Sequence, residues 1–258
     1  MFNSDLALLA CGNYSDYGDI KDAFANLANK ITQVEDRLMR LPTESDDDIS
    51  MLGPFLGRTL LESVCVALVG RIDPFRLLIV QTSQKCSTYS VEKRSNSAIV
   101  WDGDIFEKGS SQLNHGWDPE IKLKEITRGL LGDFYGELFW QPAYKKLLDN
   151  TNDYPDEELL AHYRRTITTP RNFTPYIRQR ASRLYSALSK GIHSELVVNT
   201  EIVLDKATVL DRIGDTLELC AIMSLVSHFI DTSICRIDYD QALTIYIRAN
   251  QRSVHYGD

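Results

Sequence analysis

The sequence has few of the features that mark secreted, membrane or metal-binding proteins. Its five cysteines are an odd number and form no C-x-x-C pair, which argues against a disulfide framework or a zinc ribbon. The most apolar segment, residues 219–230, is too short to span a bilayer. The first residues have no basic region before their short apolar run, which argues against a signal peptide. We therefore expect a cytoplasmic protein without a membrane segment.

The sequence also lacks an excess of positive charge. Its 28 lysines and arginines are outnumbered by 36 aspartates and glutamates, so the net charge is −8 and the pI is near 5.2. Overall attraction to nucleic acid or to an anionic membrane is not expected, and such binding would need a local basic patch. With 258 residues, 43% of them hydrophobic, the chain is long and apolar enough to bury a core.

Familiar enzyme motifs are missing as well. The chain has no phosphate-binding loop, dinucleotide-binding glycine pattern, nucleophile elbow or zinc-protease H-E-x-x-H. Its histidines, at positions 115, 162, 193, 228 and 255, show no spacing of four residues, which disfavours a zinc site on one helix. We expect neither a metal nor a cofactor.

Helical periodicity dominates what is present. It predicts an all-α bundle of eight or nine helices, with little strand signal and no internal repeat. Residues 84–118 are expected to be irregular, with a turn at Trp101–Asp104. We treat residues 1–258 as one helical domain; an N-terminal part, 1–83, and a C-terminal core, 119–258, are the alternative. The predicted helices cover residues 19–41, 55–69, 73–80, 118–130, 133–148 with a kink near Pro142, 155 onward, 174–195, 205 or 208 to 230, and 240–252.

The helix at residues 19–41 has the most regular apolar spacing, alternating steps of four and three from Ile20 to Leu41. This pattern predicts a long helix packed in a bundle. The alternative is a coiled-coil contact with a second chain, because the seam is narrow and its flanks are polar.

The helix at residues 174–195 carries most of the functional signals. Thr174 can cap it, Pro175 suits its first turn, and an inward face is formed by Ile177, Ala181, Leu184 and Leu188. A basic stripe contains Arg180, Arg183 and Lys190. A third stripe contains Ser182, Ser186 and Ser189, and includes His193 if the helix continues through Gly191. The serines predict a face on which another helix can pack closely.

Arginines are concentrated around this helix. Arg171, Arg178, Arg180 and Arg183 fall within thirteen residues and are interleaved with Phe173, Tyr176 and Tyr185. This pattern is typical of an RNA or phosphate patch, where arginines meet phosphates and aromatic rings stack on bases. The same arginines could instead bind acidic segments of this chain or of a partner subunit.

His193 is the strongest catalytic candidate, because an imidazole can act as a general acid or base near neutral pH. The alternative is a buried, hydrogen-bonded packing residue. A small-molecule pocket lined by Tyr185, Trp140 and His228 is a further possibility, which rests on composition alone.

Residues 184–195, LYSALSKGIHSE, resemble the Tyr-x-x-Leu-Ser-x-x-(Ile/Val)-His pattern near the end of a core helix in HEPN-like proteins. These are helical bundles of bacterial toxin–antitoxin, abortive-infection and antiphage systems. The matching residues are Tyr185, Leu188, Ser189, Ile192 and His193.

Active members of that superfamily share an R-x(4–6)-H motif, paired across a dimer to form a metal-independent ribonuclease. This chain has Ser186, Ala187 and Leu188 where the arginine before His193 would stand. Arg248 and His255 have the required spacing, although they lie at the C-terminus.

The resemblance and the altered motif together favour a non-catalytic or regulatory subunit that binds a partner protein, or a second copy of this chain, in a bacterial defence or toxin–antitoxin system. The alternative is a HEPN-type ribonuclease, with His193 or the pair Arg248 and His255 as catalytic residues. In either case, the expected partner- or RNA-binding residues are Arg171, Arg178, Arg180, Arg183, Lys190 and Tyr185.

Overall fold

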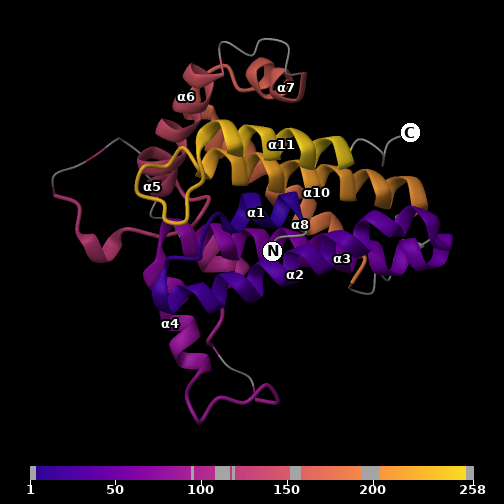
Figure 1. The fold of residues 1–258 in the computed structure, drawn as a ribbon, viewed down its shortest axis with the longest axis horizontal. Coiled ribbons are helices and arrows are strands. Elements are labelled where there is room, and N and C mark those ends of the chain that lie inside the picture. The colour runs from indigo at the N-terminus through magenta and orange to yellow at the C-terminus, as the bar shows by residue number, and fades with distance from the viewer. Residues whose placement is uncertain are drawn as a thin grey trace.

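A computed structural model describes residues 4–93, 96–107, 117, 120–151, 158–192 and 204–253. These residues form ten α-helices and no β-strand, which confirms the all-α prediction (Figure 1). The helices are α1 (Asp5–Cys11), α2 (Lys21–Arg40), α3 (Asp46–Ile72), α4 (Pro74–Gln84), α5 (Asp133–Tyr135), α6 (Gln141–Asn150), α7 (Glu158–Thr166), α8 (Phe173–Lys190), α10 (Lys206–Ser227) and α11 (Tyr239–Ser253).

Helices α3 and α10 form the centre of the bundle and make its largest helix–helix contact. They lie alongside α2 and α11, whereas α4 extends away from the others (Figure 1). Two glycines allow the close approach: a Cβ on Gly53 would lie 2.4 Å from Val209 of α10, and one on Gly57 would lie 3.1 Å from Leu188 of α8. The second half of α10, from Leu219 to Ser227, is entirely buried, as its all-round apolarity predicts.

Helix α3 is longer than the sequence pattern predicts. Ser45 caps it by accepting a hydrogen bond from the N–H of Asp48, so the helix begins at Asp46 rather than Phe55. Gly70 was expected to end it, yet the helix continues to Ile72. A Cβ on Gly70 would lie 2.6 Å from Leu77, so this glycine instead allows α4 to pack closely. α3 is long and apolar enough to cross a membrane, but 61% of its most apolar stretch is buried within the fold.

The apolar seam of α2 faces the chain's own core. Phe24, Ile31 and Leu38 are fully buried, and α2 packs on α1 and α3. The coiled-coil alternative is therefore wrong, because the seam is already covered. Helix α1, which periodicity did not reveal, contacts α2, α3, α10 and α11. Ser4 caps α1 and donates a hydrogen bond to the buried carboxylate of Glu35 on α2.

The middle of the chain is irregular where the structure describes it. Trp101–Ile105 forms one π turn with Gly103 at φ +111°, in agreement with the predicted turn. The helix expected at residues 118–130 is wrong: the described part contains a single 3₁₀ turn, Leu123–Glu125. The N–H groups of Leu130 and Leu131 instead bind the carbonyls of Asp104 and Ile105, so this backbone pairs with the irregular segment.

Near Pro142, where the sequence predicts a break or kink, the helix changes type. Short helix α5 runs into the π turn Gly136–Trp140, and α6 follows directly. Asp205 caps α10 through the N–H of Thr208, as expected, and α11 lies within one residue of its predicted bounds. Residue 155, the expected start of α7, lies outside the described residues.

A buried arginine links the start, centre and end of the fold. Arg71 of α3 is fully buried, and its hydrogen-bond partners among the described residues include no carboxylate. Its Nη1 donates to Ser227 Oγ at 2.6 Å and to the carbonyl of Leu9 at 3.3 Å, and its Nε donates to the carbonyl of Ile234 at 3.2 Å. Burial lowers the pKa of Arg71 to about 10, so it stays charged at neutral pH.

His228 completes this network as a neutral imidazole. Its Nδ1 accepts hydrogen bonds from the N–H of Ile237 at 3.2 Å and from Arg71 Nη2 at 3.0 Å. Its Nε2 is therefore protonated and donates to the carbonyl of Leu9 at 2.8 Å. Burial, and then the charge of Arg71, hold the pKa of His228 well below its ordinary value of 6.5.

Replacing Arg71 tests the importance of this link. Arg71→Leu removes the donors to Leu9, Ser227 and Ile234, and we expect it to lower the free energy of unfolding by about 3 kcal/mol in urea denaturation. Arg37→Leu, on the exposed face of α2, is the control, with an expected change within about 0.5 kcal/mol. Equal losses in the two variants would show that the network contributes no specific stability.

The neutral His228 also predicts a pH dependence. Above about pH 7 the imidazole is neutral in both folded and unfolded chains and has no effect on stability. Below about 6.5 only the unfolded chain binds the proton, so stability falls by up to about 1.4 kcal/mol per pH unit. His228→Gln, whose amide can still donate to Leu9, should show a shallower decline between about pH 6.5 and 5. Identical pH slopes for both proteins would contradict this assignment.

Candidate functional site

Helix α8 differs from its predicted form at both ends. It begins at Phe173, after the 3₁₀ turn Pro170–Asn172, and Thr174 is not its cap. The Thr174 hydroxyl is buried against Gly136 and has no hydrogen-bond partner among the described residues. The helix ends at Lys190, before Gly191, and the predicted end of the serine stripe, His193, lies outside the described residues. The inward face is as predicted, with Ile177, Ala181, Leu184 and Leu188 all buried.

Most of the predicted arginine group binds acidic residues of this chain. Arg178 pairs with Asp133, and Arg171 Nε lies 3.9 Å from Glu137. Arg180 is the most enclosed of them: its Nη2 lies 2.9 Å from Glu218 and 3.2 Å from Asp215. These arginines therefore follow the intramolecular alternative left open by the sequence.

The Arg180 contacts join three helices. Its Nη1 donates to Tyr163 Oη of α7 at 2.9 Å, while Asp215 and Glu218 belong to α10. Burial raises the pKa of Tyr163 well above its ordinary value and also raises the pKa of Asp215. The charge of Arg180 opposes both increases by lowering the two pKa values. This arrangement has the contacts expected of a structural ion-pair network.

Tyr185 anchors the irregular segment to α8. Its ring stacks on Trp101 with 4.0 Å between centroids and an 8° interplanar angle. Arg58 of α3 lies 4.4 Å from the ring centroid and donates to Tyr185 Oη at 2.6 Å. Tyr185 also lines a cleft of about 1070 Å³ between α2, α3 and α4. The sequence indicates Tyr185 but not its partners Arg58 and Trp101, because these two residues come from distant segments of the chain.

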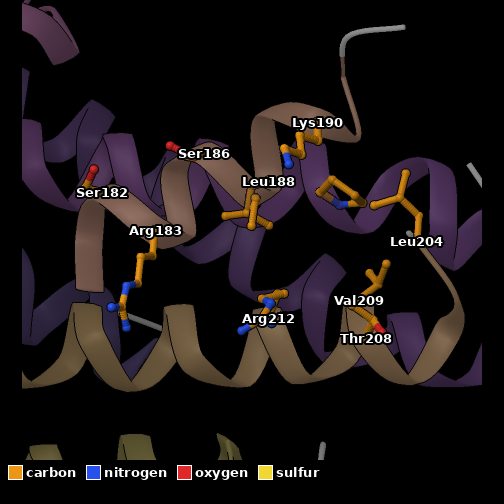
Figure 2. Close-up of a pocket in the computed structure, with 11 residues that line it drawn as sticks. Ser182, Arg183, Ser186, Leu188, Lys190, Leu204, Thr208, Val209 and Arg212 are labelled. Atoms are coloured by element: carbon orange, nitrogen blue, oxygen red, sulfur yellow. The ribbon is translucent and has the colours of Figure 1, made fainter. Parts of the chain in front are cut away.

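The serine stripe does not pack against another helix as predicted. Ser182 and Ser186 are exposed, and Ser189 donates to the carbonyl of Tyr185 at 2.6 Å and accepts from Arg58 Nη1 at 3.3 Å. The first two serines border an open groove, which we call the α8–α10 groove (Figure 2). The groove has a volume of about 490 Å³ and is lined by Pro54, Ser182, Arg183, Ser186, Ala187, Leu188, Lys190, Leu204, Thr208, Val209 and Arg212.

The groove combines an apolar surface with positive charge. Its charged lining residues are Arg183, Lys190 and Arg212, and no carboxylate is among the described residues that line it. Figure 2 shows Arg183 extending from α8 toward α10, which carries Arg212. Among the described residues, Arg183 and Lys190 make no salt bridge, and Arg212 has only the long contacts to Asp215 at 3.5 Å and Asp211 at 3.7 Å.

A second hollow continues the groove along the same helices. It has a volume of about 760 Å³ and shares Arg183, Ala187 and Arg212 with the first. Its other lining residues include Asp215 and Glu218. We call the two hollows together the α8–α10 trough.

Exposed apolar side chains adjoin one end of the groove. Met51 is 73% exposed and Phe55 is 54% exposed; they are four residues apart on one side of α3. Pro54 between them lines the groove, and a Cβ on Gly191 would lie 2.4 Å from its ring. Ile192, the residue after Gly191, is 41% exposed. The sequence does not reveal this patch, because the predicted helix begins only at Phe55 and leaves Met51 outside it.

The catalytic candidates are not assembled in the described part of the chain. His193 and His255 lie outside the described residues. Arg248, the proposed companion of His255, donates to Asp5 at 2.9 Å. The pocket proposed for Tyr185, Trp140 and His228 is wrong, because Trp140 and His228 are fully buried and donate to the carbonyls of Leu130 and Leu9, respectively.

No group of three or more His, Cys, Asp or Glu side chains in the described ranges could hold a metal ion. The chain matches no protein-family model, no curated protein and no solved structure at a significant level. The HEPN resemblance therefore stays a prediction, and the α8–α10 trough with the patch beside it is the candidate functional surface.

Paired substitutions on α8 should separate structural from surface arginines. Arg180→Ala leaves Asp215, Glu218 and Tyr163 without their shared donor, and we expect a loss of about 2 kcal/mol in urea denaturation. Arg183→Ala, three residues away and exposed, should change stability by less than about 0.5 kcal/mol. A comparable loss from Arg183→Ala would contradict its assignment as an unpaired groove residue.

Proposed function

We propose that this chain is a non-catalytic interaction subunit that binds a partner protein through the α8–α10 groove and the adjoining Met51, Phe55 and Ile192. One observation carries the proposal: a groove whose described lining has three cations and no carboxylate lies beside exposed apolar side chains, in a chain of net charge −8. Exposed apolar groups next to complementary charge are typical of protein interfaces.

A protein partner is favoured over RNA because two of the three predicted base-stacking rings are already used. Phe173 is fully buried and stacks on Tyr144, and Tyr185 stacks on Trp101. The groove itself has no aromatic lining residue. Single-stranded nucleic acid binding combines basic grooves with available aromatic faces, and this surface offers only the first.

A binding role is favoured over catalysis for a similar reason. Arg248 binds Asp5, Arg180 binds two carboxylates and His228 is held neutral in the core. The resemblance of residues 184–195 to HEPN-like helices supports a place in a cytoplasmic bacterial defence or toxin–antitoxin system. Such systems encode their protein partners nearby, so neighbouring gene products are the first partners to test.

The test is co-expression with each neighbouring gene product, followed by size-exclusion chromatography and titration calorimetry. Met51→Glu combined with Phe55→Glu should weaken the complex by about 30-fold or more, because it places charges in the apolar part of the interface. Leu123→Glu, at a side chain that is 86% exposed outside this surface, is the matched control and should have no effect.

The complex and its dependence on Met51 and Phe55 must both be observed. A chain that binds none of these products, or binds one with unchanged affinity in the double variant, would refute the proposed interface. Cleavage of RNA by the isolated chain without metal would instead favour the ribonuclease alternative.

A further inference from the structure

We infer that the partner contacts the α8–α10 trough with an acidic amphipathic α-helix. This inference rests on the proposed function and adds the chemistry and shape of the docking element. The trough, its apolar lining and its unpaired cations each restrict what can bind there.

The shape of the trough suits a helix. Its lining residues on α8 extend from Tyr176 to Lys190, and those on α10 reach from Thr208 to Glu218. At 1.5 Å per residue, the α8 side is about 21 Å long, which equals about fourteen residues of a bound helix. A surface hollow running along two helices is the geometry in which an amphipathic helix buries its apolar face.

The lining explains why the bound helix must be amphipathic. The groove has an apolar floor formed by Leu188, Val209 and Pro54, which are almost fully buried. Ala187 and Leu204 are half-buried and offer contact to an apolar stripe. A helix with apolar residues at spacings of three and four can cover them, as a core-facing helix would.

The charged residues of the trough determine which charge the flanks of the bound helix must carry. On α10, Arg212, Asp215 and Glu218 follow one another at spacings of three and line the same hollow. On α8, Arg180 forms salt bridges with Asp215 and Glu218, whereas Arg183 lines both hollows together with Arg212. Positive charge is therefore neutralised at the Glu218 end of the trough and in excess at the Lys190 end.

The excess cations predict where the acidic side chains bind. Arg183 and Arg212 line the same hollow, but Arg212 already meets Asp215 at 3.5 Å and Asp211 at 3.7 Å, so the charge that the fold leaves unpaired there is that of Arg183. Lys190 adds a third positive charge to this end, and Arg183 and Lys190 have no salt bridge among the described residues. Carboxylates of the bound helix should lie near Arg183, Lys190 and Arg212, and a neutral or basic end should lie near Glu218.

The experiment uses the full chain and three fluorescein-labelled peptides of about sixteen residues. The first is an amphipathic helix with leucines at core spacing and glutamates on its flanks. The second has lysines in place of the glutamates, and the third is a scrambled version of the first. Fluorescence anisotropy measures binding at low and physiological ionic strength, and a labelled uridine oligonucleotide is measured in parallel.

The glutamate peptide should bind at least about tenfold more tightly than either other peptide, and raising the ionic strength should weaken it. The double charge reversal Arg183→Glu with Lys190→Glu should abolish this preference and raise affinity for the lysine peptide. That rescue cannot result from misfolding. The control reversal Lys124→Glu with Lys145→Glu changes net charge equally, at exposed residues outside the trough, and should leave binding unchanged.

Four outcomes would overturn the inference: no peptide preference, no charge-swap rescue, binding of the oligonucleotide instead through Arg183 and Lys190, or self-association that blocks the trough. If a neighbouring gene product still binds through Met51 and Phe55 while the glutamate peptide does not, the helix inference fails and the proposed function stands. If that complex is also absent, both fail.

Discussion

The structure depends on a buried guanidinium group that is satisfied by two backbone carbonyls, a serine and a histidine. Arg71 binds the carbonyls of Leu9 and Ile234, the Ser227 hydroxyl and the His228 imidazole, which belong to α1, the end of α10 and the segment before α11. Helix α1 has only seven residues, too few for a stable isolated helix. Its Leu9 carbonyl is an acceptor for a cation that has left water, so α1 and Arg71 must be buried together. This requirement fixes α1 and the segment before α11 against the α3–α10 pair.

The rigid α3–α10 pair in turn positions α8. Leu188 packs against Gly57 of α3, and Arg180 binds the carboxylates of α10, so α8 is held by its apolar face and by one side of its polar face. The Tyr185 stack with Trp101 holds the irregular segment on the opposite side. The remaining face, with Arg183 and Lys190, borders open space. The groove is therefore a fixed surface of the bundle, which lowers the ordering cost of binding.

The sequence predicts the helices well where periodicity and caps agree. The caps and apolar spacing of α10 and the seam of α2 lead directly to the observed elements. The predictions are wrong where contacts between distant segments determine the backbone conformation. Gly70 looks like a stop but allows α4 to approach, and the segment before Leu130 looks helical but bonds to the backbone of Asp104 and Ile105. Helix α1 is too short to show a period. The site was found in part: the sequence identifies Arg183 and Lys190 on α8, but not Arg212 opposite them, because only the fold brings α10 beside α8.

The two polar stripes that meet in the trough show why stability alone does not explain this surface. Arg180 and Arg183 are three residues apart on α8, yet one is surrounded by the carboxylates of α10 and the other shares its hollow with Arg212. Arg212 already meets Asp215 at 3.5 Å and Asp211 at 3.7 Å, whereas Arg183 and Lys190 make no salt bridge among the described residues. An acidic residue opposite Arg183 would extend the ion-pair network along the helices. The sequence instead places these two cations beside an apolar-lined hollow on an acidic protein. Charged groups that the fold does not pair are typical of binding sites, where a ligand supplies the missing charge. Arg183 and Lys190 are accordingly the strongest physical reason to look for an anionic partner at this position.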